Sequence, residues 1–241
     1  ENRQNRWDRK GHSYQTDITQ YGSDVQVGGD LTAVAGRDLL VVGSTVKAGG
    51  DIGLGAGGDI TIASAANESS SDYYRKSGGK TVIAQEYHVK QVASVIEAGG
   101  NLDMRTDGNL VLAASHLKAG NEAYLYAGEQ LALLAAQNSD YSLYDKKKKG
   151  GWGSKETQRD EVTTVRNVGS SITTGGDLIL VSEGDQLYQK ARLESGSDLI
   201  LDSGGSITFE AVKDLDQESH EKSSNSLAWT SAKGKGSTDE T

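Results

Sequence analysis

The chain contains no cysteine and no proline among its 241 residues, and only one phenylalanine and one methionine. Without cysteine no disulfide can form, so a secreted protein of this composition would lack covalent staples. Proline makes up about 5% of average proteins, and it lacks the N–H group that a β-strand donates to its neighbour. Its absence therefore favours a fold in which almost every backbone N–H takes part in a β-ladder.

Long apolar segments and a basic charge balance are missing as well. No apolar run approaches about 18 residues, so nothing in the sequence is expected to span a membrane. The net charge of −9 argues against general affinity for nucleic acid. Hydrophobic residues make up only 35% of the chain, which is little for a thick globular core but enough for a narrow one built from small aliphatic side chains.

The residues that are present follow a repeat. Between residues 28 and 63 a Gly-rich turn that ends in an acid occurs four times, at separations of 8, 13 and 8 residues: Asp30, Asp38, Asp51 and Asp59. Apolar residues alternate after the acids, as in Ile52/Leu54. A fixed period of 21 residues with this alternation is typical of stacked parallel strands. We therefore predict an all-β fold, a right-handed parallel β-helix with about 21 residues per coil.

A similar spacing of acids and amides occurs twice more later in the chain. Its acids and amides are Asn101, Asn109, Asn121 and Glu129 in one block, and Asp177, Asp185 and Asp198, followed by Ser206, in the next. At each corner we expect glycine to adopt a positive φ and the Asp or Asn side chain to bind a nearby backbone N–H. The predicted corner residues are Gly29, Asp30, Asp38, Gly50, Asp51, Gly58, Asp59, Asn101, Asn109, Asn121, Gly176, Asp177, Asp185 and Asp198.

The longer half of each coil has an apolar residue five positions before its corner acid or amide. These residues are Val25, Val46, Ile96, Ile172 and Leu193. Equivalent positions of stacked coils lie above one another, so we predict that all five point inward and form one column along the axis of the β-helix.

Two long intervals interrupt the 13-residue spacing. They measure 42 residues from Asp59 to Asn101 and 48 from Glu129 to Asp177. Their β-branched and aromatic residues predict long β-hairpins inserted after every two coils, with turns at residues 77–80 and at residues 146–151, where four lysines precede Gly150 and Gly151. The alternative is an irregular additional coil with a shorter loop.

A third insert is expected from Val212 onward, with its turn at residues 231–236, and residues 1–17 fit the returning strand of another. The inserts divide the chain into super-repeats of 71 and 76 residues. We predict a single array over residues 1–241, with super-repeats at 30–100, 101–176 and 177–241 and the end of a preceding repeat at 1–29. Because neither end carries a capping element, we expect the chain to be a fragment of a much larger protein.

No constellation of catalytic or metal-binding residues stands out. The four histidines (His12, His88, His116 and His220) have no partner at metal-ligand spacing, and a GxSxG elbow and a P-loop are absent. The corner sequence GGD departs from the calcium-binding pattern GGxGxDxUx. A polysaccharide lyase or hydrolase would need acids that converge in one cleft, whereas here acids recur at every corner. We therefore expect no enzymatic activity, cofactor, metal or small-molecule substrate.

Charged and aromatic residues in the inserts are candidates for contact with a partner. They are Lys146, Lys147, Lys148, Lys149, Trp152 and Trp229. The lysines suit an anionic membrane surface, lipopolysaccharide or acidic glycan. The alternative is a solvated hairpin tip that prevents edge-to-edge aggregation. The aromatic residues fit equally well as cross-strand pairs that stiffen the hairpins.

The segments at residues 48–54 and 56–62 both read AGGD followed by a hydrophobic-x-hydrophobic triplet. Together with VGSTVKAGGD they resemble the haemagglutinin repeats of filamentous haemagglutinins. The longer super-repeat, with NESSSDYYRKSGG and KKKKGGWGSKETQRDEVTTVRNVGSSI as inserts, is similar to the second repeat region of contact-dependent growth inhibition effectors. The resemblance covers essentially the whole chain.

That family consists of very large exoproteins that Gram-negative bacteria export by two-partner secretion through an outer-membrane transporter. The resemblance implies a secreted cell-surface filament, which could lie in the periplasm before delivery. It also implies a role in carrying a C-terminal toxin across the target cell's outer membrane. The implied partners are therefore the transporter and the target-cell outer membrane or envelope. An adhesin whose hairpins bind host glycan or protein receptors is the alternative.

Overall fold

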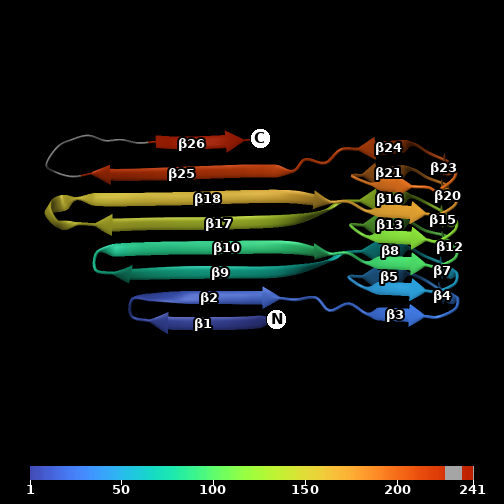
Figure 1. Ribbon diagram of the computed structural model, residues 1–241, viewed down its shortest axis with the longest axis horizontal. Coiled ribbons are helices and arrows are strands. Elements are labelled where there is room, and N and C mark those ends of the chain that lie inside the picture. Colours follow the sequence, from blue (N-terminus) through green and yellow to red (C-terminus); the bar gives the residue numbers. More distant parts are fainter. Residues whose placement is uncertain (226–234, 241) are drawn as a thin grey trace.

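The computed structural model describes residues 1–225 and 235–240, and within them the only helical element is the three-residue 3-10 turn η1 (Gly151–Gly153). Every other element is a β-strand, so the all-β prediction is confirmed. Figure 1 shows two parts: a stack of short coils on the right and a sheet of long strands on the left.

The coils are built from three parallel sheets of six strands each. The first contains β3 (Asp24–Val27), β6 (Thr45–Ala48), β11 (Val95–Ala98), β14 (His116–Ala119), β19 (Ser171–Thr174) and β22 (Arg192–Glu194). The second contains β4 (Leu31–Ala35), β7 (Ile52–Ala56), β12 (Leu102–Thr106), β15 (Ala123–Ala127), β20 (Leu178–Ser182) and β23 (Leu199–Ser203). The third contains β5 (Leu39–Val42), β8 (Ile60–Ala63), β13 (Leu110–Ala113), β16 (Leu131–Leu134), β21 (Gln186–Gln189) and β24 (Ile207–Glu210). The chain visits the three sheets in turn, as a parallel β-helix does.

Partners in neighbouring coils keep one register throughout. Leu31 pairs with Ile52, and across the corners the contacts span 21 residues where no insert intervenes. Where a hairpin lies between two coils they span 50 or 55 residues, as for Ile52 with Leu102 and Ala123 with Leu178. Each coil therefore stacks directly on the one before it, and the inserted residues leave the β-helix without disturbing its register.

Apolar columns fill the interior of the β-helix. The five residues predicted to share a column do lie in register, with Leu117 as a sixth member: Val25, Val46, Ile96, Leu117, Ile172 and Leu193. Ile96 and Ile172 are fully buried. Val25 is 40% exposed because β3 is the edge strand of its sheet.

Two ladders of side-chain hydrogen bonds run along the corners. In the first, Asp30 Oδ1 accepts the N–H of Asp51 at 2.8 Å, and Asp51 Oδ1 accepts that of Asn101 at 2.7 Å. The same contact joins Asp38 to Asp59, Asp59 to Asn109, Asp177 to Asp198 and Asp185 to Ser206. Each acid thus holds the corner of the coil stacked on its own.

The prediction of a corner at Asn121 is wrong by one residue. The position stacked on Asn101 belongs to Glu122, whose N–H is accepted by Asn101 Oδ1 at 3.3 Å. Asn121 instead fills the place that the second glycine has in the other corners, and the next corner is shifted in the same way. The same shift concealed Leu117, because counting five positions back from Asn121 ends on His116.

The corner glycines provide space and do not adopt a left-handed backbone. The expected positive φ is wrong for all four of them: Gly29, Gly50, Gly58 and Gly176. A Cβ atom at Gly50 would lie 2.0 Å from Asp30 Oδ1. The glycine is therefore required because the carboxylate of the coil below occupies the volume that a side chain would take.

The inserts form one antiparallel sheet of eight strands arranged in sequence order, which we call the hairpin sheet. Its strands are β1 (Asn2–Asp8), β2 (Gly11–Ile18), β9 (Ala65–Ser77), β10 (Lys80–Val92), β17 (Ala136–Lys149), β18 (Lys155–Val168), β25 (Leu215–Asn225) and β26 (Lys235–Glu240). Consecutive pairs are hairpins, and neighbouring hairpins pair edge to edge, as β10 does with β17. The predicted hairpins after every two coils are confirmed, and the irregular additional coil is excluded. Figure 1 shows the hairpin strands stacked in the same order as the coils.

The predicted turns are partly correct. Gly78 and Gly79 connect β9 to β10 with φ values of 55° and 76°, which a tight two-residue hairpin turn requires. Of the turn predicted at residues 146–151, Gly150 and Gly151 do lie in the turn, which covers residues 150–154, whereas the four lysines are the last residues of β17. The reason is that all four lysines pair in the ladder with β18, and the first three also pair with β10. Most of the third turn, at 231–236, lies outside the described residues.

Replacing Ile172 by Asp tests the inward column. An unpaired carboxylate in this fully buried position should lower the free energy of unfolding by about 3–5 kcal/mol. Ser171→Asp is the matched control, since Ser171 points outward on the same strand between His116 and Arg192, and it should change stability by less than about 0.5 kcal/mol. Urea melts of both variants provide the measurement. Equal midpoints for the two variants would contradict the assigned facing.

Gly50→Ala should destabilise the protein by about 1–3 kcal/mol, because the new Cβ collides with the Asp30 carboxylate. Gly29→Ala, at the equivalent position one coil earlier, has no atom within 4 Å of its Cβ and should be nearly neutral. Thermal melts of both variants measure the difference. The cost of Gly50→Ala should shrink in an Asp30→Ala background, and an undiminished cost there would show that the carboxylate is not the obstacle.

Candidate interaction surface on the hairpin sheet

Pairing registers assign the side chains of the hairpin sheet to its two faces. Its strands pack mainly against one another in the described part of the chain. Residues directly opposite on antiparallel strands point to the same side, and successive residues alternate. Trp7, His12 and Tyr74 share one row across β1, β2 and β9, and Arg6 points to the opposite side. We call the two sides the Trp7 face and the Arg6 face.

An aromatic cluster lies at the start of the Trp7 face. The His12 ring stacks on Tyr74 with centroids 5.4 Å apart, and its centroid lies 5.0 Å from that of Tyr14. Trp7 donates from Nε1 to the Tyr14 hydroxyl at 2.6 Å and remains 74% exposed. The sequence alone does not reveal this cluster, because the cluster depends on the register among three strands from two hairpins.

Two further tyrosines of the Trp7 face lie at the seam between neighbouring hairpins, and each hydrogen-bonds within its own hairpin. Tyr87 and Tyr141 lie directly opposite each other on β10 and β17. Tyr87 donates to Glu68 at 3.4 Å, and Tyr141 donates to Glu161 at 3.2 Å. Desolvation, together with the adjacent carboxylate, raises the pKa of both hydroxyls. They therefore act as cross-strand hydrogen-bond donors that stiffen the sheet.

The lysine run lies at the far end of β17. Lys146 Nζ is 2.8 Å from Glu156 Oε1, and Lys147 Nζ is 3.3 Å from Asp145 Oδ2. The hydrogen bond to Glu156 raises the pKa of Lys146. The remaining lysines, Lys148 and Lys149, are exposed. Of the tryptophans predicted beside them, Trp152 is the central residue of η1, and Trp229 lies outside the described residues.

Neighbouring hairpins meet along three seams: β2 with β9, β10 with β17, and β18 with β25. Near the β-helix each seam has a similar clamp, in which an Asn or Asp side chain of one hairpin accepts a backbone N–H from the preceding one. These contacts are Gln20 to Asn67 at 2.7 Å, Gln91 to Asn138 at 2.7 Å and Asn167 to Asp214 at 2.8 Å, and each spans 47 residues. The same contact therefore fixes each seam at its end near the β-helix, and we call these three contacts the root clamps.

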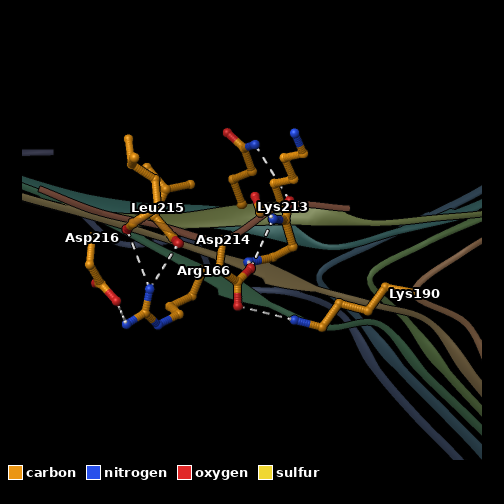
Figure 2. A network of polar contacts seen from close by, with 9 residues as sticks. Arg166, Lys190, Lys213, Asp214, Leu215 and Asp216 are labelled. Carbon is orange, nitrogen blue, oxygen red and sulfur yellow. Dashed lines mark hydrogen bonds and ion pairs between the residues drawn. The ribbon is translucent and has the colours of Figure 1, made fainter. Parts of the chain in front are cut away.

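The third clamp also ties the hairpin sheet to the β-helix. Asp214, which accepts from Asn167, also contacts Lys190, a residue of the coils, whose Nζ is 3.5 Å from Asp214 Oδ2 (Figure 2). Beside it Arg166 Nη2 is 2.5 Å from Asp216 Oδ2. The backbone N–H and side chain of Asn167 lower the pKa of Asp214, which keeps the carboxylate charged for these contacts.

Each seam also contains one His–Asp pair between different hairpins. The pairs are His12 Nε2 with Asp72 Oδ1 at 3.1 Å, His88 Nδ1 with Asp140 Oδ1 at 2.7 Å, and His220 Nδ1 with Asp160 Oδ1 at 2.9 Å. His116 differs, because it lies on β14 and contacts Ser171 Oγ. Three of the four histidines, scattered along the sequence, thus each pair with an aspartate across a seam, although they lie in different rows of the sheet.

In the pair of His220 with Asp160, the pKa values of both members are shifted. Its hydrogen bond raises the pKa of His220 and, together with a bond from Gln158, lowers the pKa of Asp160. Glu218, 3.6 Å from His220 Nε2 on the same strand, adds to the rise. The pair therefore favours the state in which both members are charged.

The acids at the corners of the coils have a structural role, because they hold the backbone of the neighbouring coil. The corner carboxylates accept backbone N–H groups of the next coil, and no group of three or more His, Cys, Asp or Glu within residues 1–225 and 235–240 is placed to hold a metal ion. In the same residues no helix is long and apolar enough to cross a membrane.

A family model described as Hemagglutinin repeat matches the chain three times, over residues 8–86, 78–153 and 149–239. No curated protein and no solved structure matches the chain. Each match begins at a hairpin tip, since residues 8, 78 and 149 adjoin or lie in the turns. The repeat of the family model therefore starts with a strand returning to the β-helix, followed by two coils and an outgoing strand.

The His220–Asp160 pair predicts that the third seam is tightest in mildly acidic solution. The pKa of His220 is raised, so its contribution is complete below the ordinary value of about 6.5 and is lost as the pH rises through the higher folded value. The pKa of Asp160 is lowered, so its contribution is complete above about 3.9 and is lost as the pH falls through the lower folded value. Amide protection factors in β25 should be greatest between about pH 4 and 6.5.

Hydrogen exchange, corrected for the intrinsic rate at each pH, measures this protection. His220→Gln should abolish the decline above neutral pH, because glutamine does not titrate. His116→Gln should retain it, since His116 pairs with a serine and not with a carboxylate. A decline that persists unchanged in His220→Gln would show that the pair does not hold the seam.

Proposed function

Since the chain belongs to the hemagglutinin repeat family, we propose that this structural segment of a secreted, filamentous, adhesin-like protein helps to deliver a C-terminal toxin across the outer membrane of a target cell in contact-dependent growth inhibition. In this proposal the segment is non-enzymatic and binds no cofactor or nucleic acid. Its task is mechanical: it forms a stalk or conduit between the producing cell and its target.

The observation that carries the proposal is that the β-helix and the hairpin sheet stack together. Every unit of two coils and one hairpin contacts the preceding unit through backbone ladders, and corner bonds and root clamps recur along the stack. Repeat proteins stabilised by nearest-neighbour contacts fold by propagation from a unit that is already formed. A chain that emerges unfolded can therefore fold outward unit by unit, and the free energy of stacking biases its movement without ATP.

In this proposal each coil holds about 21 residues and winds with a right-handed sense, as connections between parallel strands of one sheet normally do. The proposed location is the surface of a Gram-negative bacterium, reached through a two-partner-secretion transporter in the outer membrane, with residence in the periplasm before delivery. The target-cell outer membrane is the second proposed partner.

Deleting residues 78–153 from the full effector tests the role in delivery. The deletion removes β10, two coils and β17, and it joins β9 to β18 as a new hairpin of similar strand length. Export and surface display should persist, because the remaining units stack in the same register. Killing of target cells should fall, because the conduit is shorter by one unit. Target-cell survival in co-culture, with display followed by antibody, measures the outcome, and undiminished killing would exclude the conduit.

An adhesin is the second candidate, and the exposed aromatic cluster favours it. Trp7 offers a largely exposed ring beside Tyr14, and such rings suit contact with a glycan or protein receptor. Trp7→Ala should then reduce saturable binding to receptor-bearing cells by about tenfold (~1.4 kcal/mol), while Tyr21→Ala, which also removes an exposed aromatic ring, should not. If neither substitution alters binding, this surface is not an adhesin site.

A further inference from the structure

The end of the hairpin sheet farthest from the β-helix has a charge opposite to that of the whole chain. We define the cationic rim as residues 6–13, 73–84, 144–160 and 220–225, which are the parts of the first seven hairpin strands, with their turns, that begin at one row of paired residues and extend away from the β-helix. The rim contains thirteen Lys or Arg and five Asp or Glu, a net charge of +8. Because the chain as a whole has a net charge of −9, the remaining residues carry −17.

Most of the rim cations are free to meet a partner. All thirteen except Lys146 are exposed. Among the described residues, ion pairs engage three of them: Lys146 with Glu156, Lys147 with Asp145 and Arg159 with Glu161. In the β-ladder, lysine pairs with lysine at three positions: Lys148 with Lys80, Lys149 with Lys155 and Lys222 with Lys235. Like charges directly opposite each other destabilise a sheet, so the isolated chain gains nothing from this arrangement.

The distribution of the cations indicates the shape of the partner. Six point to the Arg6 face, five point to the Trp7 face, and Arg9 and Lys10 lie in the turn between β1 and β2. A linear polymer lying on one face would meet about half of them. A broad surface that approaches the rim edge-on would meet both sets together.

The residue types indicate the same partner. Nine of the thirteen cations are lysine and four are arginine. Arginine recognises a single carboxylate or phosphate through a fixed bidentate fork, whereas lysine is a flexible point charge. Clusters of four to eight basic residues near a membrane are typical of attraction to anionic lipid headgroups.

We propose that the cationic rim docks end-on against an anionic phospholipid surface, with the hairpin strands upright and the acidic β-helix held away from it. This inference builds on the delivery function proposed above by naming the lipid surface as the partner. Its test needs neither toxin nor target cells, so the two proposals can fail separately.

Flotation of the 241-residue chain with phosphatidylcholine vesicles, with and without phosphatidylglycerol, tests the proposal. The parent should bind only the vesicles that contain phosphatidylglycerol, and high salt should release it, because screening shortens the range of the attraction. Each lysine near an anionic surface contributes roughly fivefold in affinity. The triple variant Lys148→Gln/Lys149→Gln/Lys155→Gln should therefore bind on the order of a hundredfold more weakly.

A matched variant removes the same charge elsewhere. Arg37, Lys90 and Lys213 are exposed and lie outside the rim, so replacing these three by Gln should leave vesicle binding unchanged. Lys148→Arg/Lys149→Arg/Lys155→Arg should retain binding. Equal losses in the rim and matched variants, or binding to soluble heparin without binding to vesicles, would overturn the proposal. Unchanged melting temperatures show that the variants are folded.

The absence of cysteine allows a direct test of the orientation. A single cysteine at Ser77, in the rim, or at Ser197, on the coils, can carry an environment-sensitive fluorophore, and both positions are exposed. End-on docking predicts a blue shift on vesicle addition for the label at 77 and none for the label at 197. A shift of equal size at both positions would exclude end-on docking.

Discussion

The spacing of about 4.8 Å between neighbouring β-strands is the constraint on which this structure depends. Each coil of the β-helix advances the stack by one such spacing, and each hairpin adds two strands at the same spacing. One hairpin for every two coils is therefore the ratio at which the β-helix and the hairpin sheet grow at equal rates. At any other ratio neighbouring hairpins would overlap or separate, and the continuous eight-stranded sheet would break.

Several weak interactions recur at this spacing and hold each unit of two coils and one hairpin on the previous unit. The corner acids bind the backbone of the next coil, and at most corners a glycine of that coil leaves room for the carboxylate, as Gly50 does for Asp30. The root clamps and the His–Asp pairs do the same for the hairpins. Each contact is small and mostly solvent-exposed, so order arises from repetition and from the buried apolar columns rather than from any single strong interaction.

The coils and the hairpin sheet have different roles: the coils hold the fold together, and the hairpin sheet presents residues to a partner. Buried side chains and regular hydrogen bonding are concentrated in the coils, whose acids serve the corners. The hairpin sheet exposes both of its faces and carries the aromatic cluster, the titratable pairs and the cationic rim. A partner that meets the filament from the side of the sheet therefore encounters the residues whose chemistry is not already used in folding.

The sequence by itself determined the coils, the hairpins and their alternation, because apolar alternation, Gly-Gly-Asp corners and insert lengths are local patterns. It predicted the column through Ile96 and Ile172 for the same reason. It misplaced Asn121 and the backbone of the corner glycines, since both depend on which atom of the neighbouring coil lies alongside. Only the tertiary structure decided the seams, where His88 meets Asp140 across 52 residues. Those pairings follow from the stacking of the coils, which sets the register of hairpins that share no local sequence signal.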